Sequence, residues 1–151
     1  MEPLGDQELS TAIESAASPS WSVRGAAGRQ LARSDKIEEV ADVLHRLLLD
    51  AQDTWVIQET AEALLERKDT IGLRCVLMAY SQADTHDAVD HLGAALDCDP
   101  EWMTTEGADR LIKQLRTLAT DEDAGVRDGA QQSLAKLRPR EEWAHDSETD
   151  S

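Results

Sequence analysis

One short segment holds the densest group of side chains in the chain that could bind a metal or move a proton. His86 and Asp90 lie four residues apart, as do Asp87 and His91, so each pair shares one face of a helix. Imidazole and carboxylate groups are common ligands of zinc and iron. A single helix supplies too few converging ligands for a closed site, so we expect no metal and interpret these side chains as solvated or paired along the helix. An enzyme or cofactor-lyase-like protein with its site around His86–His91 is the alternative.

The two cysteines give no sign of nucleophilic catalysis. Cys75 lies in the apolar run 73–78, and Cys98 is flanked by aspartates, which raise a thiol pKa. They lie 23 residues apart, without the CxxC spacing of a redox or zinc site and with no signal peptide ahead of them. We therefore expect free thiols, no catalytic residue, no cofactor and a cytoplasmic location.

The composition favours a single all-helical domain. The 151 residues are 40% hydrophobic but include four Trp, one Tyr and no Phe, so the core must be built from aliphatic side chains, as in packed helices. No apolar run approaches the roughly 20 residues that cross a membrane. We predict a soluble, monomeric protein.

The charge balance narrows the class of partner. Fifteen Lys and Arg against 31 Asp and Glu give a formal net charge of −16, which repels phosphate backbones and anionic lipids. Nucleic-acid and membrane binding are therefore disfavoured. The acidity has two further interpretations that stay open: solubility or adaptation to high salt on one side, and attraction to a basic partner on the other.

A repeated pattern organises the chain. Asp123, Val126, Ala130 and Leu134 place a capping residue three positions before an apolar stripe of spacing four, which predicts the start of an amphipathic helix. The pattern recurs at intervals of roughly 32–38 residues, the signature of stacked helical hairpins. The other three occurrences of the pattern are Ser20, Val23, Ala27 and Leu31, then Asp53, Val56, Thr60 and Leu64, then Thr85, Ala88, Leu92 and Leu96.

The pattern also fixes expected helix limits. Asp6 can cap the first helix, Ser20 the helix Trp21–Ala32 and Asp53 the helix Thr54–Arg67. Gly25 and Gly28 predict a close approach of another backbone. Extra residues around 97–103 predict a turn or an additional helical piece, Thr104 or Thr105 caps the next helix, and Pro139 ends the last one.

The two occurrences of the pattern that contain Val23-Arg24 and Val126-Arg127 resemble the HEAT-repeat family in its short bacterial form. The resemblance implies an all-α fold, an α-solenoid or α-α superhelix of about four HEAT-like hairpins over residues 1–138. It also implies that Arg24 and Arg127 pair with acids of a neighbouring repeat. Residues 139–151 are acidic and without period, so we predict a flexible tail that folding does not require.

The second helices of a HEAT-like solenoid normally line its concave face, and the positions off the apolar stripes give its lining. These positions are mostly acidic, with one large aromatic side chain and one main basic contribution. We predict a partner-binding surface of Arg29, Trp55, Gln58, Glu59, Glu62, Asp87, Asp90, His91 and Asp128.

The predicted function follows from that surface and from the lack of catalytic groups. We expect a non-enzymatic adaptor or regulator that binds a basic protein segment. A specific version is a small immunity or antitoxin-like protein that neutralises a basic effector. Trp55 carries its own alternative, because a Trp at a helix start can instead pack beneath the preceding helix as part of the core.

Overall fold

A computed structural model describes residues 5–149 of the chain, with the side chains of residue 5 and residues 7–137. Its elements are eight α-helices and two short 3-10 helices, with no strand among the described residues, which confirms the all-α class. The chain divides into two compact units, unit 1 ending at Asp99 and unit 2 beginning at Pro100. The division lies in segment 97–103, where the sequence pattern lengthens.

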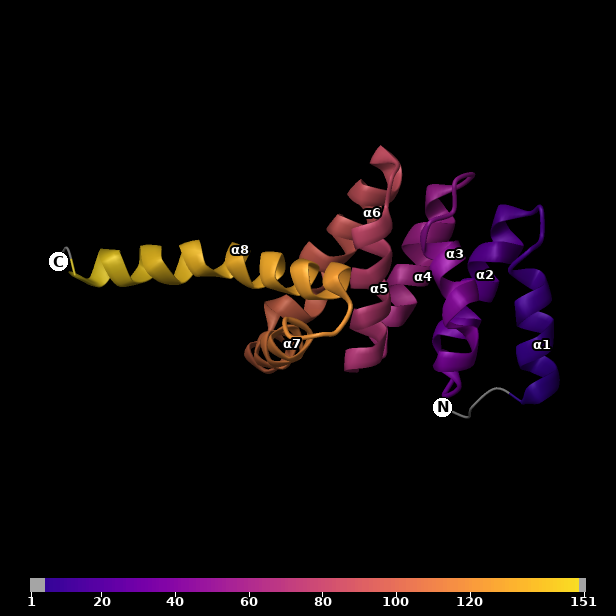
Figure 1. Cartoon of the computed structure of the whole chain (residues 1–151), viewed down its shortest axis with the longest axis horizontal. Coiled ribbons are helices and arrows are strands. Elements are labelled where there is room, and N and C mark those ends of the chain that lie inside the picture. Colours follow the sequence, from indigo (N-terminus) through magenta and orange to yellow (C-terminus); the bar gives the residue numbers. More distant parts are fainter. Residues whose placement is uncertain (1–4, 150–151) are drawn as a thin grey trace. The chain divides into compact units, whose positions relative to one another are not determined.

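Unit 1 is built from consecutive helices that pack as pairs, α1 with α2, α3 with α4, and α5 with α6 (Figure 1). Helix α4 also packs between α2 and α6, and α3 packs against α5. The core between them is aliphatic, with leucines such as Leu31, Leu44 and Leu64 fully buried. The elements are α1 Asp6–Ser15, α2 Trp21–Ala32, η1 Ile37–Val40, α3 Ala41–Leu48, α4 Thr54–Glu66, α5 Thr70–Gln82 and α6 His86–Asp97.

Most of the predicted caps form. The Asp53 carboxylate accepts the backbone N–H of Trp55 at 2.8 Å, and the Thr85 hydroxyl accepts that of Ala88 at 3.2 Å. Ser20 is the residue before α2, but its hydroxyl lies 3.0 Å from that of Ser22 and caps nothing. The prediction for Asp6 is wrong by one position, because Gly5 precedes α1 and the helix already includes Asp6.

Close packing at Gly25 and Gly28 is confirmed, although side chains rather than a backbone fill the space. A Cβ on Gly25 would overlap the indole of Trp55, and one on Gly28 would overlap the hydroxyl of Thr60. The two glycines therefore let α4 side chains lie directly on the backbone of α2. They position α4 at the centre of unit 1.

The turn between α4 and α5 places Lys68 at φ 63°, in the left-handed region that favours glycine. We expect Lys68→Gly to raise the free energy of unfolding by about 0.5–1 kcal/mol, because it removes this backbone strain. Lys68→Ala is the matched control, since it deletes the same side chain and keeps the strain. Urea denaturation of both variants measures the difference, and a Lys68→Gly protein no more stable than Lys68→Ala would contradict the prediction.

Unit 2 contains η2 Pro100–Met103, α7 Thr105–Leu118 and α8 Ala124–Thr149, with α7 packed against both other elements. Thr104 caps α7 through the N–H of Gly107 at 3.0 Å, and Asp123 caps α8 through that of Val126 at 2.9 Å. The predicted Asp123 cap is confirmed, and of the alternatives that the sequence left open the structure has Thr104 as the cap and a helical piece before α7.

The prediction that Pro139 ends the last helix is wrong, because α8 continues to Thr149 (Figure 1). Proline removes one backbone hydrogen bond from a helix interior, but it is followed here by good helix formers such as Arg140, Glu141 and Glu142. Residues 150–151 and all side chains from 138 onward lie outside the described residues. The flexibility of segment 139–151 stays a prediction.

Candidate functional site

The predicted binding residues of helix α4 form one stripe along its outer side. Trp55, Gln58 and Glu62 are exposed and Glu59 is half-buried, whereas Val56 and the rest of the apolar stripe are buried. The spacing of three and four residues keeps these side chains on one face. Since α4 lies between α2 and α6, the predicted residues of these three helices come from adjacent elements.

Arg29 of α2 does not stand free on this surface. Its guanidinium donates to the Glu59 carboxylate at 2.6 Å and reaches the Glu66 carboxylate at 3.4 Å, so it joins α2 to α4. The pKa of Arg29 is raised: burial opposes the charge, but the hydrogen bond to Glu59 and the charge of Glu66 outweigh it. Arg29 and Glu59 therefore hold helices together, and Glu62 is the α4 acid left for a partner.

Glu62 accepts a hydrogen bond from the Gln58 amide at 3.0 Å, one turn earlier on α4. This bond leaves the charge of Glu62 uncompensated by any cation in the described part of the chain. An exposed, uncompensated carboxylate is the kind of group that steers a basic partner.

Residues 86–91 form the first turns of α6, and most of their polar side chains are exposed to solvent. His86 and Asp90 form an i,i+4 pair at 3.1 Å with 87% and 60% of their side chains exposed, while Asp87 is exposed and His91 is half-buried. Among the residues that the structure describes, no group of three or more potential ligands could hold a metal ion. The pairing along the helix agrees with our interpretation of the four side chains.

Asp128 belongs to the other compact unit of the chain. It lies exposed on α8 of unit 2, whereas all the other predicted residues belong to unit 1. The sequence pattern gives Asp128 a position equivalent to that of α4 or α6 residues, and its part in the binding surface stays a prediction. The candidate surface, called the acidic face below, consists of Gln58, Glu59, Glu62, Asp87, Asp90 and His91.

Trp55 is neither a free anchor nor a core residue. Its ring covers Gly25 and meets the ring of Trp21, with centroids 5.1 Å apart and planes at 84°. Trp55 remains 37% exposed and Trp21 51% exposed. Our sequence reasoning missed Trp21, although both tryptophans occupy the first turn of a second helix and Gly25 follows Trp21 by one turn.

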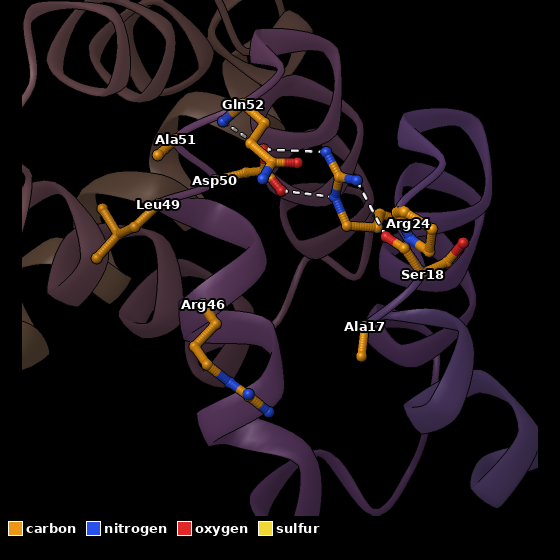
Figure 2. A pocket seen from close by; sticks show the side chains of 9 residues that line it. Ala17, Ser18, Arg24, Arg46, Leu49, Asp50, Ala51 and Gln52 are labelled. Atoms are coloured by element: carbon orange, nitrogen blue, oxygen red, sulfur yellow. Dashed lines mark hydrogen bonds and ion pairs between the residues drawn. The ribbon is translucent and has the colours of Figure 1, made fainter.

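The buried ion pair between Arg24 and Asp50 fastens α2 to the loop before α4 (Figure 2). Arg24 Nε donates to Asp50 at 2.8 Å, Nη2 donates to the other carboxylate oxygen at 3.3 Å, and Nη1 donates to the Ser18 carbonyl at 3.0 Å. Burial acts to raise the pKa of Asp50, but hydrogen bonds from Arg24 and from the backbones of Asp53 and Gln52 lower it overall. The structural role predicted for Arg24 is confirmed.

Arg127 makes one corresponding contact in unit 2. Its Nη1 donates to the Asp121 carbonyl at 3.0 Å, six residues earlier, as Nη1 of Arg24 does to Ser18. In both units the arginine thus ties the start of the second helix to the preceding loop. Pairing of Arg127 with an acid of a neighbouring repeat stays a prediction.

An open hollow of about 360 Å³ lies beside the Arg24–Asp50 pair (Figure 2). Small loop residues form much of its wall, and Arg46 and Leu49 line its α3 side. Arg24 and Asp50 neutralise each other at the hollow, and Arg46 adds a second guanidinium to its lining. Cys75 offers no reactive group, because burial raises the pKa of its thiol.

Comparisons with models of known protein families, with characterised proteins and with solved structures found no match to this chain. Helices long and apolar enough to cross a bilayer are absent from the described residues.

Proposed function

We propose that this protein is a non-enzymatic adaptor that binds a basic segment of a protein partner on the acidic face. One observation carries the proposal: Glu62, Asp87 and Asp90 are exposed carboxylates on the adjacent helices α4 and α6. Like charges on neighbouring helices repel one another, and a basic segment lying across both helices relieves that repulsion.

We propose further that the chain is a HEAT-like α-solenoid and that the acidic face is part of its concave side. Support comes from the packing of α2, α4 and α6 as successive neighbours, and from the equivalent arginine-to-carbonyl bonds of Arg24 and Arg127. In solenoids each hairpin contacts its neighbours, and the second helices form an extended binding surface.

A charge-reversed variant tests the proposed function. Glu62→Lys, Asp87→Lys and Asp90→Lys together should weaken binding of a capped peptide of about ten alternating lysines and glycines by about tenfold or more. That length suffices because the neighbouring helices α4 and α6 pack about 10 Å apart, a distance that about three extended residues span. Glu59 is left unchanged, since reversing it would break its ion pair with Arg29.

A second triple variant separates the acidic face from net charge. Glu38→Lys, Glu39→Lys and Asp42→Lys change the charge equally at exposed positions of η1 and α3. Fluorescence anisotropy at about 0.02 M and about 0.5 M salt measures peptide affinity, because salt screens contacts between exposed charges. Equal losses in both triple variants, or no peptide binding by the natural protein, would overturn the proposal.

A further inference from the structure

The Trp21–Trp55 pair is a feature that binding by charge alone does not use. Its rings lie at the start of α2 and α4, with 51% and 37% of the two residues exposed. Exposed indoles of this size normally gain by burial, and Trp is enriched among residues that dominate binding energy.

The two rings are held in place by their surroundings. Trp55 lies directly over Gly25, where any side chain would displace it, and its backbone N–H is bound by the Asp53 cap at 2.8 Å. Trp21 stands edge-to-face against it, with planes at 84° and centroids 5.1 Å apart. This contact fixes the two rings relative to each other before any partner arrives, which lowers the ordering cost of binding.

The two arginines of α2, which follow Trp21 in the sequence, are already neutralised. Arg24 is held by Asp50, with 8% and 9% of the two side chains exposed. Arg29 contacts both Glu59 and Glu66, whose two negative charges exceed its single positive charge. A cationic ligand therefore meets no free positive charge from these side chains.

The side-chain charge left without a cationic partner on α4 and its cap is negative. Asp53, two residues before Trp55, and Glu62, two turns after it, have no cationic partner in the described part of the chain. An anionic ligand would be repelled here, and an uncharged one would gain nothing from these carboxylates. Charge complementarity selects a cation.

We infer that the Trp21–Trp55 pair receives a lysine or arginine side chain of the basic partner, held by cation–π contact with the indole faces. The inference rests on the proposed function, and it assigns the lysine or arginine as the residue that anchors the partner. A cation within about 6 Å of an indole centroid is attracted to the ring face, most strongly for Trp. The acidic face then engages the remaining basic residues of the segment.

The test uses three versions of the lysine–glycine peptide that differ only at one terminal residue, which is arginine, lysine or the uncharged norleucine. The natural protein should bind the first two about five- to tenfold more tightly than the third. Trp21→Leu, which keeps an apolar side chain and removes the indole, should abolish this preference while leaving the melting temperature within a few degrees. Ile71→Thr, at an exposed position of α5, is the control and should preserve the preference.

Nuclear magnetic resonance supplies a second readout that does not depend on the stability of a variant. The indole N–H signals of Trp21 and Trp55 should shift on peptide addition, while that of Trp102 in η2 stays in place. Tight norleucine binding, or an unchanged preference in Trp21→Leu, would overturn the inference while the charge-reversal result left the proposed function standing. Failure of every peptide to bind the natural protein would overturn the proposed function as well.

Discussion

Asp50→Ala is expected to lower the free energy of unfolding by about 3–5 kcal/mol, because it leaves the buried guanidinium of Arg24 without its counter-charge. Both side chains are more than nine-tenths buried, so the guanidinium that loses its counter-charge is largely shielded from water. The change also removes the acceptor for the backbone N–H groups of Gln52 and Asp53 at 2.9 Å. Urea denaturation followed by circular dichroism measures the loss.

Asp42→Ala provides the control for this variant, since Asp42 is an exposed aspartate on α3 and should change stability by within about 0.5 kcal/mol. An Asp50→Ala protein as stable as the control would show that the Arg24–Asp50 pair contributes nothing to folding.

The contribution of Asp50 should depend on pH in a defined direction. Burial acts to raise the pKa of Asp50, but the hydrogen bonds from Arg24 and from the backbones of Asp53 and Gln52 together make it lower in the folded protein than in the unfolded chain. Its stabilisation is therefore fully present above the ordinary aspartate pKa and is lost as the pH falls through the lowered folded-state value. The stability gap between the natural protein and Asp50→Ala should be constant near neutral pH and should narrow only in that acidic range. A gap that widens on acidification would contradict the assignment.

Gly28→Ala is expected to destabilise the protein by about 1–3 kcal/mol, although alanine is the better helix former. The added Cβ would overlap the hydroxyl of Thr60, which is held by a 2.8 Å hydrogen bond to the Val56 carbonyl inside α4. On a Thr60→Ala background the hydroxyl is gone and only the Cβ of residue 60 stays 3.2 Å from the added one, so Gly28→Ala should then cost clearly less than in the natural protein.

Gly28→Ala and Thr60→Ala together form a double-mutant cycle, which measures the coupling free energy between the two positions and so between α2 and α4. Denaturation midpoints of the natural protein, the two single variants and the double variant measure it. Additive effects of the two substitutions would mean that Gly28 and Thr60 do not pack against each other.

Local signals in the sequence predicted the helices well because caps and apolar stripes act over a few residues. Helix Trp21–Ala32 has the expected limits, and Asp53, Thr85 and Asp123 cap the helices assigned to them. Pro139 misled the prediction, because a proline penalty competes with the helix propensity of the residues around it.

The candidate site was predicted less completely because its details depend on residues far apart in the chain. Arg29 meets Glu59 thirty residues later, and no spacing rule within one helix reveals such a pair. Trp21 gains its importance only through Trp55, which lies on another helix. The exposed carboxylates of α4 and α6 could be predicted, since they simply lie off the apolar stripes.

The most direct test of the acidic face as a binding surface compares what three immobilised proteins capture from an extract of the cells that make this chain. The natural protein and the Glu38, Glu39 and Asp42 variant should retain the same basic protein. The Glu62, Asp87 and Asp90 variant should retain at least about tenfold less of it, as measured by quantitative mass spectrometry. Equal capture of that protein by all three, or its loss from both variants alike, would contradict the account.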